Sequence, residues 1–264
     1  MDLDSAWLAE GGNGAGRGMQ NCACRGADFA RLRTASTALS ASTGERIMAD
    51  TSPRKLVKVL LDSYGQSYAQ ELGLVPLRNT PAPLFQLLSM SLLLSARIAA
   101  GNAMRAARAL IESGLTTPRK MADATWQRRV NVLTRHGYKR YDERTSTMLG
   151  DTAQRLLDVY GGDLRRLREE AGRDPAREKQ LLMQFSGIGD VGADIFLREV
   201  QTVWHEAYPY ADARVQRSAA RLGLARCPQA LAKLVSRRDF ARFAAALVRV
   251  DLQKAHGEVR KAAR

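Results

Sequence analysis

Two features of this sequence are able to do chemistry: a run of glycines and an aspartate that follows it. Gly187, Gly189 and Gly192 match the pattern G-x-G-x-x-G within the stretch FSGIGDVGADIF. Such glycines let a phosphate approach backbone N–H groups, so the pattern suits a dinucleotide site or a hairpin that grips DNA phosphates. A third interpretation is a packing turn between two helices. Asp212 follows Gly192 by 20 residues, and its carboxylate could serve a ribose hydroxyl or a centre that becomes positive during a reaction.

The segment before the glycines separates these interpretations. A dinucleotide site needs a strand before the first glycine, inside a β-α-β unit. Here the preceding segment opens with Asp174-Pro175 and continues with charged residues and leucines, which is typical of a capped helix. We find no alternating strand pattern in the chain. The sequence therefore predicts helix, glycine hairpin, helix, and a nucleotide-binding oxidoreductase becomes a distant alternative.

The elements that must position these residues are helices. From Ser52-Pro53 onward, apolar residues recur at helical spacing between polar and proline-containing breaks. We expect helices at about 53–64, 84–96, 102–111, 147–160, 175–185, 190–203 and 236–254, and hence an all-α protein. Residues 1–47 are rich in Gly, Ala and Ser without any period, so we expect them to be disordered. A native start at Met48 is a hypothesis that mass spectrometry would test.

The charge of the chain favours a polyanionic partner. There are 41 Lys and Arg residues against 27 Asp and Glu, a net charge of +14. Residues 1–47 carry five of each sign, so the whole excess belongs to residues 48–264. Each cation near a phosphate releases a condensed counterion, which makes double-stranded DNA the expected partner. The alternative is that the arginines only cover solvated helix faces.

The remaining composition narrows the class of protein. Three cysteines are too few for a disulfide framework, and with the scattered His136, His205 and His256 they form no ligand set for zinc or an iron–sulfur cluster. We therefore expect no metal and no cofactor. No apolar run reaches the roughly 18 residues of a membrane span, and no secretory signal opens the chain. We expect a monomer in the cytoplasm, associated with the nucleoid.

Residues on both sides of the hairpin make the pattern more specific. Leu182 and the hairpin 185–189 are followed by the apolar pair 195–196, and one helix later by the segment 209–215, PYADARV. This arrangement resembles the helix-hairpin-helix (HhH-GPD) superfamily of DNA glycosylases, in particular the endonuclease III group. In that family a leucine-glycine-aliphatic-glycine hairpin precedes an aspartate at the start of a helix.

Two upstream stretches extend the resemblance to roughly residues 50–225. Leu92 to Arg97 is similar to a buried family helix that ends in Leu-Ser-Ala-Gln, and Gly137-Tyr138 is similar to a glycine-aromatic turn. The resemblance implies a two-domain helical fold with a DNA-binding cleft between the domains. It places residues 79–204 in a six-helix barrel that ends in the helix-hairpin-helix at about 176–204. Residues 48–78 and 205–264 would form the second, discontinuous domain.

The resemblance also assigns roles to residues. Asp212 would be the catalytic carboxylate, which stabilises the positive charge that develops on the sugar when an N-glycosidic bond breaks. The alternative is that Asp212 only caps the helix that starts at Ala213. The DNA-binding residues would be those of the hairpin and three arginines: Gly187, Ile188, Gly189, Val191, Gly192, Arg97, Arg140 and Arg214. Tyr138 and Tyr141 are candidates for stacking on a flipped base, with packing of the barrel as the alternative.

The chain departs from the family in two places. Val191 stands where bifunctional members carry the lysine that forms a Schiff base, so the resemblance implies a monofunctional, water-using enzyme. Only Cys227 lies where the family has its four-cysteine iron–sulfur loop, so we expect no cluster. Residues 213–264 instead hold 13 basic residues against three acidic ones, and part of this segment would contact phosphates.

The sequence thus predicts a monofunctional DNA glycosylase that removes a damaged or mismatched base from duplex DNA. A non-catalytic DNA-binding protein with the same hairpin is one alternative. A bifunctional glycosylase and lyase is another, with Lys139 or Lys179 as conceivable nucleophiles. The identity of the base stays open.

Overall fold

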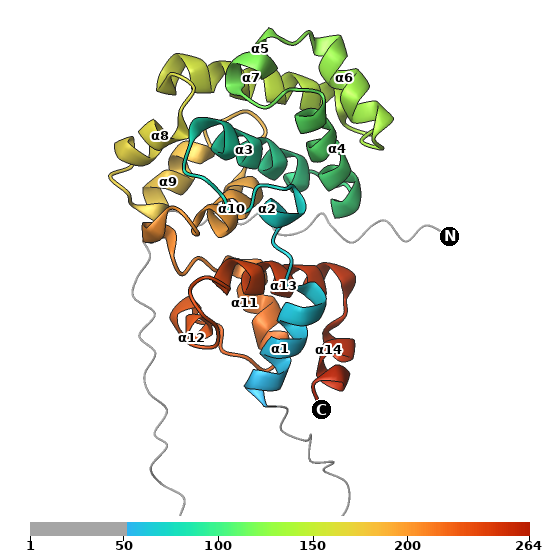
Figure 1. The fold of residues 1–264 in the computed structure, drawn as a ribbon, viewed down its shortest axis with the longest axis vertical. Helices are drawn as coiled ribbons and strands as arrows, with labels where there is room; N and C mark the ends of the chain where they lie inside the picture. Colours follow the sequence, from blue (N-terminus) through green and yellow to red (C-terminus); the bar gives the residue numbers. More distant parts are fainter. Residues whose placement is uncertain (1–51) are drawn as a thin grey trace, which may run out of the picture. The chain divides into compact units, whose positions relative to one another are not determined.

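The chain folds into a series of helices. The computed structural model describes residues 52–264, and these residues form helices without any strand (Figure 1), which confirms the predicted all-α class. The predictions for residues 1–47 and Met48 lie outside the described residues. In chain order the elements are α1 (Pro53–Tyr64), α2 (Tyr68–Glu71), α3 (Pro81–Ser95), α4 (Ala100–Glu112), α5 (Pro118–Asp123), α6 (Trp126–Arg135), α7 (Asp142–Tyr160), α8 (Leu164–Glu170), α9 (Pro175–Leu182), α10 (Asp190–Val200), the 3-10 helix η1 (His205–Ala207), α11 (Ala213–Arg221), α12 (Pro228–Ala232), α13 (Phe240–Gln253) and α14 (His256–Ala262).

Proline and capping residues set several helix starts. Helix α1 begins at Pro53 as predicted, although the Ser52 side chain makes no capping hydrogen bond. At α9 the predicted cap is present, because the Asp174 side chain accepts a 3.0 Å hydrogen bond from the Ala176 amide. Helix α3 begins at Pro81, earlier than expected, so that Pro81 and Pro83 lie within its first turn. Proline is tolerated there because the first amides of a helix have no intrahelical acceptor.

Other boundaries also differ from the expectation. Helix α7 begins at Asp142 rather than at 147, and α13 begins at Phe240 rather than at 236. Helix α9 ends at Leu182 instead of 185, because the chain turns there into the hairpin. The short helices α2, α5, α6, α8, α12 and α14 were not expected.

Two groups of helices can be followed in Figure 1. In the first, α1 packs against α13 and α14, and α11 packs against α13. The Lys55 ammonium donates a 2.8 Å hydrogen bond to the carbonyl of Arg264, so the first and last helices meet. In the second, α3 packs against α4 and α10, while α7 packs against α5 and α6. The predicted domain boundaries at 79 and 205 stay a prediction.

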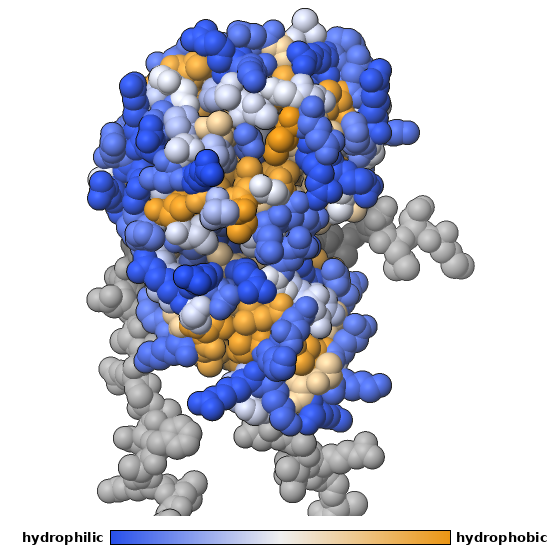
Figure 2. Space-filling model, in the orientation of Figure 1, coloured by the Kyte–Doolittle hydropathy of each residue, from blue (hydrophilic) through white to orange (hydrophobic). Residues whose placement is uncertain are grey.

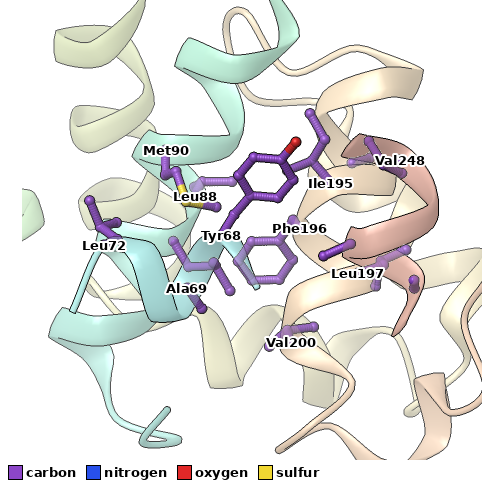
Figure 3. Close-up of a cluster of buried hydrophobic side chains, with 14 of the residues drawn as sticks. Tyr68, Ala69, Leu72, Leu88, Met90, Ile195, Phe196, Leu197, Val200 and Val248 are labelled. Atoms are coloured by element: carbon purple, nitrogen blue, oxygen red, sulfur yellow. The ribbon is translucent and has the colours of Figure 1, made fainter. Parts of the chain in front are cut away.

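Helix α10 lies against both groups. It packs against α3 and α9, and also against α13. Figure 3 shows the buried side chains where α2, α3, α10 and α13 meet, with the ring of Tyr68 beside that of Phe196. The labelled members are Tyr68, Ala69, Leu72, Leu88, Met90, Ile195, Phe196, Leu197, Val200 and Val248. This close packing holds α10 in place, so the residues at its two ends have fixed positions relative to each other.

The visible face is mainly hydrophilic, with hydrophobic residues gathered in patches between charged ones (Figure 2). Within residues 52–264, no helix combines the length and the apolar character that a bilayer span requires.

Candidate functional site

The predicted order of helix, glycine-containing turn and helix is present, and the turn, here called the hairpin, connects α9 to α10. Its turn is closed by a 3.0 Å hydrogen bond from the Ile188 amide to the Phe185 carbonyl. Gly187 has a φ of +78°, a conformation that favours glycine. From α7, the Thr152 hydroxyl donates to the Ser186 carbonyl at 2.8 Å. Ile188 is buried in the core and anchors the hairpin, whereas Gly189 after it is exposed.

Gly187 and Gly189 have different surroundings. A Cβ added at Gly187 would lie 2.8 Å from the Met148 sulfur and 3.2 Å from Leu92 Cγ, so the fold itself requires a glycine there. A Cβ added at Gly189 would meet nothing within 4 Å, and the extended backbone of Gly189 suits any residue. Gly189 precedes α10, whose start receives no capping hydrogen bond from a side chain in the described part of the chain. The hairpin therefore offers unobstructed backbone beside free helix amides, which suits a phosphate.

A cavity of about 630 Å³ adjoins the hairpin. It brings together several of the predicted site residues: Arg97, Tyr138, Tyr141, Gly187, Ile188 and Gly189. Apolar side chains, among them Met148 and Phe185, form much of the remaining wall, and Arg144 adds a second guanidinium. The cavity therefore has walls of mixed character, partly apolar and aromatic and partly polar, with hydrogen-bond donors from two arginines.

The predicted aromatic residues lie differently in this cavity. Tyr138 is fully buried and donates a 3.3 Å hydrogen bond to the Leu93 carbonyl, so it packs the wall. Burial raises the pKa of the Tyr138 hydroxyl, which keeps it protonated. Tyr141 is half-buried, and the guanidinium of Arg140 lies 5.4 Å from the centre of its ring. One face of Tyr141 is therefore occupied by Arg140, while Arg97 is exposed at the cavity.

Asp212 is the N-cap of α11, as the alternative interpretation predicted. Its Oδ1 accepts hydrogen bonds from the amides of Arg214 at 2.8 Å and Val215 at 3.1 Å. Its Oδ2 accepts a hydrogen bond from Nη1 of Arg198. Asp212 is 8% exposed and does not line the 630 Å³ cavity. The carboxylate is thus fixed in position and orientation by three donors.

Arg198 belongs to α10 and is 3% exposed. Burial tends to lower the pKa of Arg198, but the nearby Asp212 and Glu199 outweigh it and raise the pKa. The guanidinium is therefore charged. The Glu199 oxygens accept hydrogen bonds from the amides of Tyr68 at 3.3 Å and Ala69 at 2.9 Å.

A second charged network lies between the hairpin and Asp212. The Lys179 ammonium pairs with Asp190 at 2.7 Å and with Asp194 at 2.6 Å. The Tyr210 hydroxyl donates to Asp194 at 2.5 Å. Burial raises the pKa of Asp194 and the charge of Asp212 adds to the rise, against the lowering effect of Lys179 and Tyr210. Burial alone would lower the pKa of Lys179, but its two aspartates outweigh it and raise that pKa.

Three further predicted residues are placed as follows. Val191 is 54% exposed in the first turn of α10. Arg214 is partly exposed and lies 3.5 Å from Asp251 of α13. Gly192 is buried, and a Cβ there would make only ordinary contacts with Ile188 and Ser95.

Sequence reasoning missed the polar face of α10. Asp190, Asp194 and Arg198 recur every four residues, so they share one side of the helix. That spacing was visible in the sequence, but their partners, Lys179 and the segment 210–212, are distant along the chain.

The solved structures that are similar to this chain include two endonuclease III–DNA complexes. One is a non-covalent endonuclease III–DNA complex, at 17% identity and a TM-score of 0.47, with 75% of this chain and 83% of that chain covered. The other is a trapped endonuclease III–DNA covalent intermediate, an estranged-adenine complex, at 16% identity and a TM-score of 0.43, with 75% and 85% covered. No family model matches the chain, and no curated protein does. At these sequence identities and TM-scores, the similarity does not imply a shared activity.

Proposed function

We propose that this protein is a monofunctional DNA glycosylase, which hydrolyses the N-glycosidic bond of a damaged or mismatched base flipped out of duplex DNA. The proposal rests mainly on one observation: helix α10 begins at the hairpin and contacts Asp212 near its other end. Its N-terminus follows the open Gly189, and its side chain Arg198 contacts Asp212. From residue 190 to residue 198 the axis advances about 12 Å, or roughly three to four base pairs along a duplex. A phosphate at the hairpin and a sugar near Asp212 would then belong to one stretch of DNA.

The chemistry requires a fixed carboxylate. As the bond from the sugar to the base breaks, the base leaves with the bonding electrons and positive charge grows on the anomeric carbon. The Asp212 carboxylate would stabilise that charge. A water oxygen then bonds to the anomeric carbon and loses a proton, to Asp212 or to solvent, while the departing base gains one. A carboxylate held by three donors needs little reorganisation for this role.

The base itself would enter the cavity beside the hairpin. Its volume of about 630 Å³ exceeds the size of a single base, and its walls combine aromatic and apolar side chains with polar ones. Arg97 and Arg144 offer donors to carbonyl or phosphate oxygens. Tyr141 can stack on a base through the face that Arg140 leaves open.

Two observations support hydrolysis rather than strand cleavage by a lysine. Val191 cannot act as a nucleophile. Lys179 lies near Asp194, but its two aspartates hold it protonated, and a Schiff base forms only from a neutral amine.

A non-catalytic DNA-binding role is the second candidate, and one observation favours it. Asp212 is 8% exposed, and three hydrogen bonds already engage its carboxylate. A purely structural cap and ion pair has the same geometry.

Excision of bases from duplex oligonucleotides, wild type beside Asp212→Asn, separates the candidates. The panel carries uracil, thymine opposite guanine, oxidised pyrimidines, mismatched adenine and alkylated purines. Strand breaks that appear only after hot alkali, made by wild type and not by Asp212→Asn, would support the proposal. Intact substrates with tight duplex binding by both proteins would contradict it and favour the binding role. A protein–DNA adduct trapped by borohydride would point to a lyase lysine instead.

A further inference from the structure

Arg198 is a buried charge whose presence the fold alone does not explain. It is 3% exposed, on a helix whose other buried residues are apolar or small except for Glu199. Moving a guanidinium out of water is costly, and a well-packed apolar pair often gives equal or greater stability than a buried ion pair. Its Nε atom has no hydrogen-bond partner among the described residues, which adds to this cost. The residue that Arg198 contacts therefore explains why a charged side chain is buried at this position.

Asp212 is the carboxylate that Arg198 contacts. The ionisable groups that act on the pair come from several elements: Asp194 and Glu199 of α10, Tyr68 of α2, and Tyr210 from the segment before α11. Glu199 is engaged by the amides that begin α2, and Asp194 is engaged by Lys179 and Tyr210. Neither of them replaces Asp212 as the hydrogen-bond partner of Arg198.

The contact determines how the Asp212 carboxylate is turned. The amides of Arg214 and Val215 hold Oδ1, but they do not by themselves fix the direction of Oδ2. The hydrogen bond from Arg198 fixes Oδ2. An ionised carboxylate has about four acceptor positions, so three donors leave one acceptor position of Asp212 for a substrate or a water molecule.

We propose that Arg198 is a positioning residue for Asp212, which holds Oδ2 in the orientation that the bond-breaking step requires. The inference rests on the proposed glycosylase function. Arg198 acts through Asp212 and not by contact with DNA, since it is 3% exposed. The donor comes from the same helix that begins at the hairpin, so a phosphate docked at Gly189 and the carboxylate at Asp212 keep a constant separation.

The test compares Arg198→Met and Arg198→Lys with wild type on the base that wild type excises. Three quantities are measured: the single-turnover excision rate at saturating protein, the Kd for the same duplex, and the Tm. For Arg198→Met we expect a loss of about tenfold to hundredfold in rate, the usual size for one hydrogen bond to a charged group, with Kd unchanged within about twofold. For Arg198→Lys we expect a smaller loss of about threefold to tenfold, because an ammonium restores the charge but not the planar geometry.

Arg168 offers a matched control. It is also largely buried and pairs with a carboxylate, Glu206, with a 2.6 Å contact from Nη2. Arg168→Met should lower the Tm comparably and leave the excision rate within about twofold of wild type, since within residues 52–264 its hydrogen bonds go to Glu206 and not to Asp212.

The outcomes separate this inference from the proposed function. An active wild type with an unimpaired Arg198→Met overturns the inference alone, as does an equal rate loss in Arg168→Met at equal Tm. If Arg198→Met does not fold, Arg198→Lys decides, and its full activity overturns the inference. A wild type that binds duplex but excises no base overturns the proposed function and the inference with it.

Discussion

Gly187 and Gly189 differ in what surrounds them, and this difference separates a requirement of the fold from a requirement of a ligand. Gly187 has a positive φ and is closely packed against Met148 and Leu92, whereas Gly189 has open space where a side chain would lie. The absence of a side chain at Gly189 leaves the start of α10 accessible.

We expect Gly187→Ala to affect stability and Gly189→Ala to affect DNA binding. Gly187→Ala should lower the free energy of unfolding by about 1–3 kcal/mol, because alanine resists a positive φ and clashes with its neighbours. Gly189→Ala should change stability by less than about 0.5 kcal/mol but weaken duplex binding, because its methyl group keeps a phosphate from the backbone. Thermal denaturation and fluorescence anisotropy measure the two effects. Unchanged affinity of Gly189→Ala would show that no close approach occurs there.

At the scale of elements, the contact between α9 and η1 contains a buried acid. Glu178 of α9 is fully buried, and neither of its carboxyl oxygens has a hydrogen-bond partner among the described residues. Burial raises the pKa of Glu178 to about 8, and the neighbouring Glu206 adds to the rise. Burial acts in the same direction on Glu206, but the hydrogen bond from Arg168 outweighs it and holds the pKa of Glu206 below its usual range. Glu178 is therefore neutral in the folded protein near pH 7.

This neutrality makes stability depend on pH. The folded state keeps a proton on Glu178 that the unfolded chain loses above its ordinary pKa near 4.5. The stability that this proton contributes is complete below pH 4.5. As the pH rises towards 8, the free energy of unfolding declines by at most about 1.4 kcal/mol per pH unit. Glu178→Gln should remove this decline, so its advantage in Tm over wild type should grow from pH 5 to pH 8.

The exposed Glu112 at the end of α4 provides the control. Glu112→Gln should follow the wild-type pH dependence in the same melts, recorded by circular dichroism. A constant difference in Tm between Glu178→Gln and wild type across this pH range would contradict the raised pKa.

The helices that sequence reasoning predicted are those with a marked start or a long apolar stripe. Pro53 and Asp174 signalled α1 and α9, and the stripe of α10 was recognised. The short helices were missed because four to ten residues show too little periodicity, and tertiary packing stabilises them.

The candidate site was predictable only in part. The hairpin is formed by residues that are neighbours in the sequence, so the glycine pattern alone predicted its geometry. The capping role of Asp212 was also local and was predicted. Its pairing with Arg198 was not, because the two residues come from different helices and no local pattern relates them. The catalytic role of Asp212 stays a prediction.

For the whole molecule, net charge is a poor measure of the charge available to DNA. Of the 13 basic residues in 213–264, six are engaged within the protein. These are Arg214, Arg221, Arg237, Arg242, Arg249 and Arg260. Arg97, by contrast, is exposed at the cavity beside the hairpin.

We therefore expect the salt dependence of duplex binding to depend on where a positive charge is removed, and not only on how much charge is removed. In a plot of log affinity against log salt concentration, each phosphate contact contributes a slope of about −0.9. Arg97→Gln should reduce the slope by about one contact. Arg165→Gln removes the same charge from a residue already paired with Asp163 at 2.6 Å, and should leave the slope unchanged. Equal slopes for both variants and wild type would remove Arg97 from the DNA interface.

The packing of α1 against α13 has a consequence for synthesis of the chain. Leu56, Val57 and Leu60 of α1 are buried, and α13, which α1 packs against, lies far along the sequence. At about 5–20 residues per second, the interval before α13 emerges from the ribosome is on the order of 10–35 s. During that interval the hydrophobic face of α1 is open to chaperones. A reading frame that ends before residue 240 leaves this face without its partner, so a late stop codon harms the start of the described fold as much as its end.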